Sequence, residues 1–359
     1  MINYVAHWER ILIQSRSQII DELNNHKFRS ICPIVNEDKL KNHYDESLHW
    51  DISREKFFDF SSVISLKKIL NDTNDGSIFH VFTLKTGFLF MLSYLITNKK
   101  FKVTLSITGL GYFFSNHTLA KLFKNLLRPL FIVLINKTFD NIIYQNLTDQ
   151  SLFNNYSRFK NNTYLIESSG INSSDYILKN KFNADTKIIL AGRLLKDKGI
   201  ESFINLSNEF SSHNLTFYLA GELDLGNPKS LTEYDLADIK ANSSINYLGY
   251  IDLPKEICNF DLLLSLSDHE GFSRVVVEAL YVGLFVIAFE NNGTKFIKDF
   301  DNSSLLKSKD IGLLKKEIYK FLNSNQSIST ENRKNIEKKY STKNIASKFD
   351  EIYNDNVDG

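Results

Sequence analysis

The stretch DHEGFSRVVVEALYVG, residues 268–283, holds two acidic residues, Glu270 and Glu278, eight positions apart. The apolar run before it (260–267, FDLLLSLS) predicts a buried strand, and the spacing of apolar residues after Ser273, a typical N-cap residue, predicts a helix. A buried carboxylate is unfavourable unless a partner satisfies it, so both acids need an explanation. A strand–loop–helix junction also presents free N–H groups at the helix start, and these attract phosphate or a polar sugar.

Outward from this junction, strands and helices alternate in two series. Strands are predicted at 2–7, 77–83, 101–108 and 139–146 with helices at 17–26 and 87–98, and again at 186–193, 215–221, 245–250, 260–267 and 284–290 with helices at 199–210 and 273–283. Repeated strand–helix units predict parallel, doubly wound sheets. We therefore expect an α/β protein with two Rossmann-like domains, and in such sheets ligands bind beyond the carboxyl ends of the strands.

The interval 168–186 lacks apolar periodicity and is interpreted as the link between the two sheets. The predicted domains are residues 1–167 and 168–340, facing a cleft, and the C-terminal helix within 341–359 is expected to pack back on the first domain.

The composition is that of an ordinary globular protein. The 359 residues are too many for one core, and the formal net charge of +1 gives no reason to expect a nucleic-acid partner. Two cysteines, Cys32 and Cys258, exclude a disulfide framework and a zinc motif. The sequence opens without a long apolar run, and its most apolar piece (126–135, LLRPLFIVLI) is too short to span a membrane, so we expect no signal peptide and a cytoplasmic location.

A second junction, AGRLLKDKGI (191–200), carries two cations, Arg193 and Lys198, between a predicted strand and a predicted helix. Fixed cations at a strand end suit a diphosphate, because Arg donates forked hydrogen bonds and Lys supplies a point charge. The alternative is a pair of solvated loop cations. Glu278 can grip a vicinal diol such as a ribose through its two oxygens. Its alternative is to pair with a buried cation, while Glu270 caps a loop.

Together, the segments EGFSRVVVE, GRLLKDKG and YLAGELDLGNP resemble the retaining glycosyltransferase family 4, which has the GT-B fold. Further segments resemble a bacterial branch of that family that extends polyprenyl-diphosphate-linked sugars for O-antigen, capsule or glycoprotein glycans. These segments are FHVFTLKTG (79–87), ITGLGYFF (107–114), IIYQNLTDQSLF (142–153) and SSGINSSDY (168–176). The resemblance covers most of residues 1–310, in order.

The resemblance implies that 1–167 is the acceptor domain and 168–340 the nucleotide-sugar donor domain, and it implies a role for each matching residue. Arg193 and Lys198 would hold the donor diphosphate and stabilise it as it leaves. Glu270 would contact the donor sugar, and Glu278 would grip the nucleotide ribose. Backbone amides facing the sugar and phosphate would come from Gly271, Phe272 and Ser273, and the loop facing the transferred sugar would contain Gly109 and Gly111.

The sequence departs from the family pattern at three places. Thr108 stands where many members have a histidine, although the bacterial branch also lacks it. The segment AHWERILIQSR (6–16) replaces a Gly-rich loop after the first strand, so another part of the first domain must face the donor phosphates. Phe296 stands where an acid is common, which removes one expected sugar or base contact.

The activity implied is transfer of a hexose or N-acetylhexosamine from a nucleotide-diphosphate sugar, by family habit a UDP-sugar, to a polyprenyl-diphosphate-linked glycan. No cofactor and no metal are implied, and we interpret Asp299-Phe-Asp301 as a solvated turn rather than a cation site. Two alternatives are a nucleotide-sugar epimerase of the same fold and a catalytically inactive partner subunit of a membrane glycosyltransferase complex.

A basic, apolar stretch predicts a membrane contact. No acidic residue occurs from Lys99 to Phe139, and the segment HTLAKLFKNLLRPLFIVLI (117–135) interleaves basic and bulky apolar residues. Such a pattern is typical of a helix at an anionic membrane surface. We expect peripheral binding at the inner face of the cytoplasmic membrane, and the alternative is a core helix with a solvated basic face.

Overall fold

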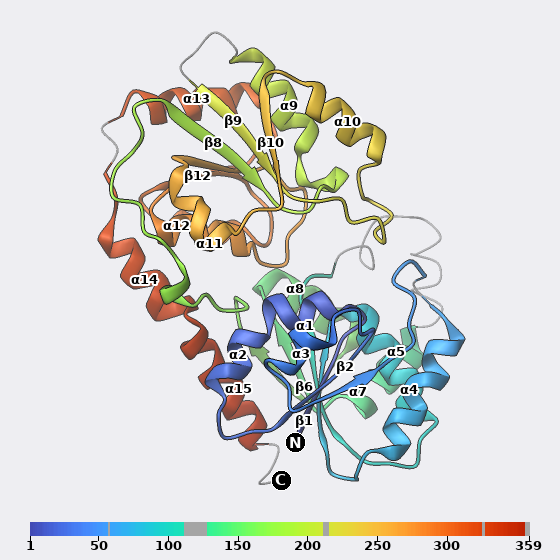
Figure 1. Cartoon of the computed structure of the whole chain (residues 1–359). Helices are drawn as coiled ribbons and strands as arrows, with labels where there is room; N and C mark the ends of the chain where they lie inside the picture. Colours follow the sequence, from blue (N-terminus) through green and yellow to red (C-terminus); the bar gives the residue numbers. More distant parts are fainter. Residues whose placement is uncertain (57, 111–127, 211–214, 325–326, 356–359) are drawn as a thin grey trace. The chain divides into compact units, whose positions relative to one another are not determined.

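The computed structural model describes residues 1–359 apart from 57, 111–127, 211–214, 325–326 and 356–359 (Figure 1). The chain divides into two compact units. The first unit consists of Met1–Gly170 with Thr342–Gly359, and the second of Ile171–Ser341. Each is built around one parallel β-sheet, which confirms the predicted α/β class with two Rossmann-like domains.

Seven parallel strands form the sheet of the first unit, in the order β3-β2-β1-β4-β5-β6-β7. The strands are β1 (Ile2–Val5), β2 (Phe28–Cys32), β3 (Glu46–His49), β4 (Ile78–Phe82), β5 (Lys102–Ile107), β6 (Asn141–Tyr144) and β7 (Asn162–Leu165). The helices are α1 (Glu9–Ser15), α2 (Ser17–Glu22), α3 (Glu37–Lys41), α4 (Phe60–Asp72), α5 (Leu84–Leu95), α7 (Arg128–Thr138), α8 (Leu147–Ser157) and α15 (Thr342–Asp355).

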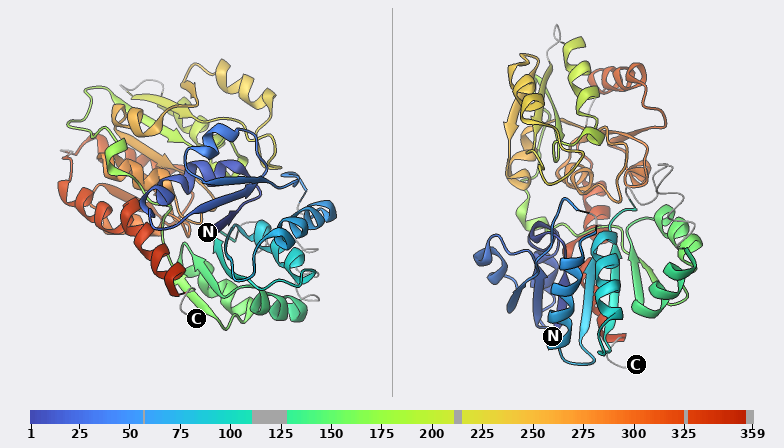
Figure 2. Two further views of the ribbon diagram at one scale, coloured as in Figure 1. Left: turned by 60° about the horizontal axis from the view of Figure 1, so that its bottom comes forward. Right: turned by 90° about the vertical axis from the view of Figure 1, so that its right-hand side faces the viewer.

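Helices cover both faces of this sheet because successive strand side chains point to opposite faces (Figure 2). On β4, Phe79 and Val81 pack in one apolar cluster with residues of α4, α5, α7 and α8. The next residue, Phe82, packs in a second cluster with residues of α1, α2 and α15. The C-terminal helix α15 buries Ile345, Phe349 and Ile352 in that second cluster. The last helix of the chain therefore belongs to the core of the first unit.

A buried chain of polar groups also ties α15 to the sheet. His80 is fully buried, and its Nδ1 lies 2.5 Å from the hydroxyl of Tyr353 on α15. Its Nε2 lies 2.7 Å from the hydroxyl of Ser106, and the hydroxyls of Tyr353 and Tyr4 are 2.7 Å apart. Each of these polar atoms thus has a partner inside the core, as buried polar groups require.

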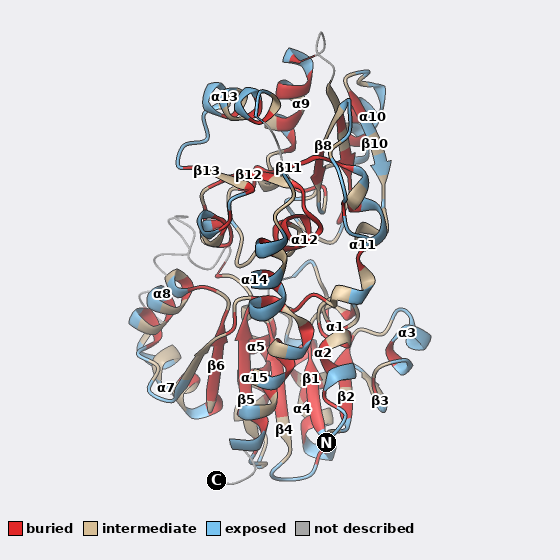
Figure 3. Ribbon diagram, turned by 90° about the vertical axis from the view of Figure 1, so that its left-hand side faces the viewer, coloured by how far each residue is buried: buried red, intermediate tan, exposed pale blue. Residues whose placement is uncertain are grey.

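Six parallel strands form the sheet of the second unit, in the order β10-β9-β8-β11-β12-β13. The strands are β8 (Thr186–Ala191), β9 (Leu215–Ala220), β10 (Ile245–Gly249), β11 (Leu262–Ser265), β12 (Phe285–Phe289) and β13 (Ser303–Leu306). The helices are α9 (Ile200–Glu209), α10 (Glu233–Ala241), α11 (Leu253–Glu256), α12 (Arg274–Val282), α13 (Ile311–Leu322) and α14 (Thr330–Tyr340). The central strands are the most buried layer, and the helices bury the sides that face them (Figure 3).

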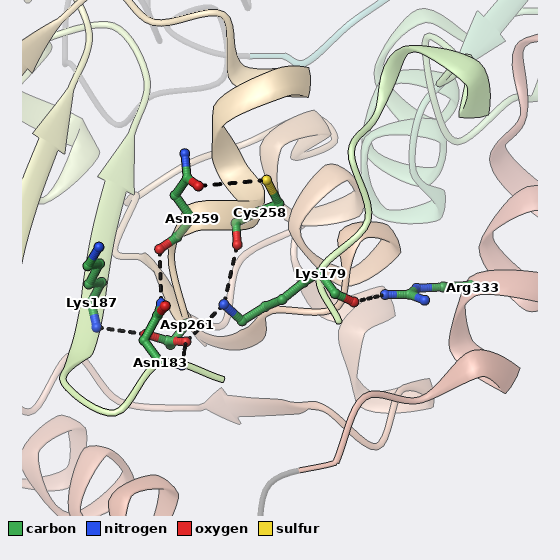
Figure 4. Close-up of polar contacts among 7 residues, drawn as sticks. All are labelled: Lys179, Asn183, Lys187, Cys258, Asn259, Asp261 and Arg333. Carbon is green, nitrogen blue, oxygen red and sulfur yellow. Dashed lines mark hydrogen bonds and ion pairs between the residues drawn. The ribbon is translucent and has the colours of Figure 1, made fainter. Parts of the chain in front are cut away.

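A buried ion pair holds the amino-terminal edge of this second sheet (Figure 4). Lys179 Nζ lies 2.9 Å from Asp261 Oδ1, and both side chains are almost fully buried. The Asp261 carboxylate also accepts hydrogen bonds from the backbone N–H groups of Asn183 and Lys187, at 2.8 and 2.9 Å. Arg333 of α14 donates to the carbonyl of Lys179 at 2.7 Å. Because every charge here has close partners, we assign this cluster a structural role.

In both sheets the direction of strand addition reverses once. The reversal lies between β1 and β4 in the first unit and between β8 and β11 in the second. In open α/β sheets, this topological switch point is where the loops at the carboxyl ends part and ligands bind. Each unit therefore has one position at which a site is expected. Across the described residues, no helix is both long and apolar enough to cross a membrane.

Candidate functional site

The switch point of the second unit is lined by the loops that follow β8 and β11. The two loops are joined by a hydrogen bond from the N–H of Asp268 to the carbonyl of Asp197, 2.9 Å. Gly199 makes this approach possible, because its φ is +73° and a Cβ there would lie 2.4 Å from the carbonyl oxygen of Leu266. A side chain would thus collide with backbone as well as strain the chain. The closeness of the two loops depends on this glycine.

Lys198 and Glu270 meet across this switch point. The ammonium of Lys198, from the loop after β8, forms an ion pair with Glu270 Oε1, from the loop after β11. Ser267 donates a hydrogen bond to the same oxygen at 3.0 Å. Both charged side chains are 18% exposed, so the pair is mostly buried but still reaches solvent. Two residues singled out from separate motifs are thereby brought together.

The loop after β12 packs against Glu270 and the loop that carries it. A Cβ at Gly293 would lie 2.5 Å from the Cβ of Glu270, so only glycine fits there. The side chain of Asn291 is buried and donates to the carbonyl of Ser267 at 3.0 Å. The carbonyl of Gly293 accepts from the N–H of Ser273 at 3.1 Å. Sequence reasoning did not single out Asn291 or Gly293, although the NNG triplet directly after a strand was a signal for such a loop.

Arg193 lies against a buried carboxylate from the next loop. Its Nη1 is 2.7 Å from Asp224 Oδ2, and the Asp224 side chain is 4% exposed whereas that of Arg193 is 40% exposed. Asp224 follows β9, the strand beside β8, and it too was missed from the sequence. The buried carboxylate orients the guanidinium and leaves its outer edge open to solvent. The two cations of the AGRLLKDKGI loop are therefore each held by an acid from another loop.

Glu278 is buried inside α12 with two partners. Its Oε1 accepts a hydrogen bond from the Tyr176 hydroxyl at 2.8 Å and from Arg274 Nε at 2.8 Å. Burial, and after it the charge of Glu278, raises the pKa of Tyr176, so the phenol remains a donor at neutral pH. Glu278 thus pairs with the cation of Arg274. Such a pairing was the alternative to a role in binding a ribose.

The amino end of α12 contains an unsatisfied hydroxyl. Ser273 occupies the N-cap position, but its side chain makes no capping hydrogen bond, contrary to the expectation for that residue. Its Oγ is buried and has no hydrogen-bond partner in the described part of the chain. Next to it, Phe272 stacks on Phe296 with ring centroids 4.8 Å apart, and both rings contact Tyr340. Phe296 therefore contributes to an apolar wall at the position where the resemblance led us to expect an acid.

The remaining predicted positions are placed as follows. Gly109, two residues after the end of β5, has a φ of +137°, a conformation that favours glycine. Gly111 lies outside the described residues, as does 117–127, the first part of the predicted membrane stretch. Asp299 and Asp301 are exposed, which fits the solvated turn. No group of three or more His, Cys, Asp or Glu side chains suited to a metal ion occurs within the described ranges.

We compared the sequence and the fold with those of known proteins. Residues 175–343, nearly the whole second unit, match the family described as "Glycosyl transferases group 1", so the second unit is a glycosyl transferases group 1 domain. Solved structures with both units of this fold are glycosyltransferases of the GT-B type. Sucrose-phosphate synthase from Thermosynechococcus elongatus has a TM-score of 0.79 at 15% identity, with 99% of this chain and 98% of that chain covered. Anabaena Alr3699/HepE in complex with UDP and glucose has a TM-score of 0.72 at 14% identity, with 98% and 99% covered.

Similar sequences are glycosyltransferases as well. The GtfA subunit of the UDP-N-acetylglucosamine–peptide N-acetylglucosaminyltransferase of Streptococcus pneumoniae is 31% identical over 34% of this chain and 24% of its own length. The capsular polysaccharide biosynthesis glycosyltransferase CapM of Staphylococcus aureus is 24% identical over 45% and 44%. An uncharacterized glycosyltransferase of Methanocaldococcus jannaschii, MJ1069, is 26% identical over 82% and 75%. The chain thus spans about a quarter of GtfA, less than half of CapM and three quarters of MJ1069.

Proposed function

We propose that this protein is a retaining glycosyltransferase that moves a hexose or N-acetylhexosamine from a nucleotide-diphosphate sugar to a lipid-linked glycan. The observation that carries the proposal is the pairing of Lys198 with Glu270 at the switch point of a domain that matches group 1 glycosyl transferases. An ammonium and a carboxylate side by side can serve the two ends of a sugar diphosphate. The cation suits the diphosphate and the acid suits the sugar hydroxyls.

The diphosphate is assigned to Lys198, Arg193 and the amino end of α12. In transfer, the bond between the sugar C1 and the diphosphate oxygen breaks, and negative charge develops on that oxygen. Fixed cations and free helix N–H groups stabilise such charge without reorganising. The buried Ser273 hydroxyl, which has no hydrogen-bond partner among the residues that the structure describes, is available to donate to a phosphate oxygen. Asp224 keeps the Arg193 guanidinium oriented for the same task.

Glu270 is assigned to the donor sugar and Glu278 to the nucleotide ribose. When a diphosphate draws the Lys198 ammonium, the Glu270 carboxylate becomes free to accept from sugar hydroxyls, with Ser267 still holding it in place. For Glu278 to accept from a ribose, a ribose hydroxyl must take the place of the Tyr176 donor or bind beside it. The assignment of Glu278 therefore has a specific competitor, the Tyr176 hydroxyl.

Front-face substitution is the chemistry that fits these groups. The acceptor hydroxyl attacks C1 from the side that the diphosphate leaves, so configuration is retained, and its proton passes to the leaving diphosphate oxygen. The protein supplies orientation and charge stabilisation through Lys198, Arg193 and α12, and in this proposal needs no metal and no cofactor. Turnover that is unchanged by a chelator supports this part, and loss of turnover with chelator contradicts it.

A UDP-sugar and a polyprenyl-diphosphate-linked glycan of a surface polysaccharide, such as O-antigen or capsule, are the proposed substrates. UDP is named for GtfA and for the HepE complexes, and CapM is named for capsular polysaccharide. The first unit contains a small apolar cavity of about 10 Å³. Apolar side chains and one glycine line it: Leu84, Gly87, Phe88, Met91, Leu105, Phe131, Ile135 and Phe139.

Peripheral association with the inner face of the cytoplasmic membrane is part of the proposal. On α7, Leu130 and Val133 are 57% and 61% exposed one helical turn apart, and Lys137 on the same helix is exposed too. An apolar ridge beside cations suits an anionic lipid surface.

Release of nucleoside diphosphate, measured with and without a lipid-linked acceptor, tests the function. A transferase releases UDP from a UDP-sugar faster when the acceptor is present. An epimerase converts the donor without releasing UDP. An inactive partner subunit does neither alone. Only the first outcome supports the proposal, and screening several nucleotide sugars for thermal stabilisation identifies the donor to use.

A further inference from the structure

The loop after β9, residues 221–231, is bound to the loop after β8 that carries Arg193 and Lys198. Three backbone hydrogen bonds of 2.9 Å join the two loops: the N–H of Leu194 to the carbonyl of Glu222, the N–H of Leu231 to the carbonyl of Leu194, and the N–H of Lys196 to the carbonyl of Lys229. We call residues 221–231 the strap. A shift of the strap would therefore shift the loop with the two proposed diphosphate cations.

Short-range hydrogen bonds hold the strap in shape. Its bend is closed by a bond from the N–H of Asn227 to the carbonyl of Asp224, 2.7 Å. The N–H of Asp224 donates to the hydroxyl of Ser230 at 3.0 Å, and the N–H of Lys229 donates to the side-chain oxygen of Asn227 at 3.0 Å. Such side-chain to backbone bonds are typical of tight turns. They fix the places of Asp224 and Lys229 within the strap.

The strap supplies one charged side chain near each of the two cations. Asp224 contacts Arg193 directly. Lys229 contacts the neighbour of the second cation: its Nζ lies 2.7 Å from Asp197 Oδ2, and Asp197 directly precedes Lys198 in the chain. Both cations of the AGRLLKDKGI loop therefore have a charge from the same segment beside them.

Asp197 is a carboxylate next to a cation that the donor needs. Its side chain is 20% exposed, and its Oδ1 is buried without a hydrogen-bond partner in the described part of the chain. A buried carboxylate oxygen gains free energy from any donor that reaches it. The Lys198 ammonium is turned to Glu270 instead, and Lys229 supplies the cation for Asp197. Lys229 thus occupies the carboxylate that lies nearest to Lys198 along the chain.

We infer that Lys229 is a positioning residue of the donor site, which neutralises Asp197 and so keeps the Lys198 ammonium available to the donor diphosphate. The inference rests on the proposed function, because it takes Lys198 as the cation for the diphosphate. Without Lys229, the Asp197 carboxylate attracts the Lys198 ammonium, and a diphosphate has to compete with it. Lys229 touches no substrate and acts only through these two residues.

Calorimetric titration of the full-length protein with UDP tests this role. Lys229→Gln should weaken UDP binding about tenfold, the size of one charge-assisted hydrogen bond. The melting temperature should change little, since ion pairs between partly exposed side chains add little to stability. Lys229→Arg keeps the charge and should retain UDP binding. Lys320→Gln is the matched control, because it breaks a pair on α13 with Glu317, whose side chain is also 20% exposed, and it should leave UDP binding unchanged.

Two double variants separate this role from other ways in which Lys229 could matter. Asp197→Asn removes the competing charge, so Asp197→Asn with Lys229→Gln should bind UDP within about twofold of the wild type. In a Lys198→Ala background, Lys229→Gln should have no further effect, because the residue through which it acts is gone. A Lys229 that bound phosphate itself would give additive losses. An ion pair with a purely structural role would leave the double variant with Asp197→Asn as weak as Lys229→Gln.

UDP affinity like the wild type in Lys229→Gln overturns the inference. An additive loss with Lys198→Ala overturns it too, and so does a lack of rescue by Asp197→Asn. UDP release from a UDP-sugar in the presence of a lipid-linked acceptor is measured in parallel. UDP binding with the expected dependence on Lys229, but without any transfer, overturns the proposed function alone. Absence of UDP binding by the wild-type protein overturns both.

Discussion

Lys198 and Glu270 form an ion pair across the switch point of the second unit, although 72 positions separate them in the sequence. The pairing depends on Gly199, which lets the two loops touch, and on Asn291 and Gly293, which support the Glu270 loop. These groups follow three different strands of one sheet, β8, β11 and β12. The order of the strands therefore brings these residues together, and a small change in any of these loops should alter turnover.

Removing the Lys198 ammonium should nearly abolish transfer. For Lys198→Ala we expect turnover to fall about 100-fold or more, the typical loss of one charge-stabilising donor. Stability should change much less than turnover, since both side chains reach solvent and Ser267 still donates to Glu270. UDP release and thermal unfolding measure the two effects. Lys309→Ala is the matched control, because it breaks an exposed pair with Asp268 of the same loop and should keep turnover. Turnover like the wild type in Lys198→Ala would remove the central assignment.

Glu278 and Tyr176 can be separated by two conservative variants. If Glu278 grips the ribose, Glu278→Gln should raise the KM for the donor about tenfold or more, because a hydrogen bond to a charged group is lost. Tyr176→Phe removes an internal donor that competes with the ribose for Glu278, so it should lower stability by about 1 kcal/mol and leave KM unchanged or lower it. Steady-state kinetics and urea unfolding of both variants decide the matter. A destabilised Glu278→Gln with unaltered KM would assign the residue to the Arg274 ion pair alone.

The sequence predicts this junction well because its signals are local. The strand predicted at 260–267, the helix after Ser273 and the loop with Arg193 and Lys198 were each predicted from apolar periodicity in a short segment of sequence. The structure contains a strand, a helix and a loop at these places. The edge strands β3 (Glu46–His49) and β7 (Asn162–Leu165) were not predicted. An edge strand buries little of its surface and so shows no clear apolar alternation, as the exposure of these two confirms.

The partners of the site could not be predicted in the same way. Asp224 and Asn291 contact Arg193 and the Ser267 carbonyl from loops far away in the chain, so no spacing within one motif indicates them. The close contact of Gly199 with Leu266 is likewise a consequence of strand order. What the sequence does show is that a polar residue follows directly after a strand, and parallel strands bring all such residues to one edge.

Replacing Gly199 should be more harmful than replacing Gly249, because only at Gly199 would a side chain collide with a neighbouring backbone. Gly249 also has a left-handed φ, +67°, but no atom lies within 4 Å of a Cβ built there. Gly249→Ala should therefore cost about 1–2 kcal/mol from backbone strain alone. Gly199→Ala adds a collision with the Leu266 carbonyl, so its loss of stability should be clearly larger and turnover should fall as Lys198 moves. Urea unfolding and UDP release compare the two; equal effects would mean that the loops readjust without difficulty.

The exposed ridge of α7 should matter for membrane binding. We expect the protein to bind vesicles with anionic lipids and to be released by salt, since each cation near such a surface contributes about 1 kcal/mol. Leu130→Ser with Val133→Ser should weaken co-sedimentation, and so should reversal of Lys121 and Lys124 to Glu. Tyr234→Ser, at an exposed aromatic of the second unit, is the control. Vesicle binding that is unchanged in all of these variants would contradict a membrane contact through α7.

The first unit should lose stability as the pH falls below about 6.5, because of His80. Burial, and after it the charge of Arg16, holds the pKa of His80 well below its ordinary value, so the folded imidazole stays neutral. The unfolded imidazole takes up a proton near pH 6.5. Between that pH and the lower folded pKa, the unfolded state binds more protons, and the free energy of unfolding decreases with each step downward in pH. Above pH 7 the imidazole is neutral in both states, so His80 causes no loss of stability there.

Urea unfolding at pH 7 and pH 5, followed by tryptophan fluorescence, measures this dependence, because both tryptophans, Trp8 and Trp50, lie in the first unit. His80→Gln can retain hydrogen bonds to Ser106 and Tyr353 but cannot titrate, so the fall in stability between the two pH values should shrink even if the variant is less stable overall. His49→Gln, at an exposed histidine of the same unit, should keep the full dependence. A pH dependence that survives in His80→Gln unchanged would mean that other groups of the first unit govern its acid sensitivity.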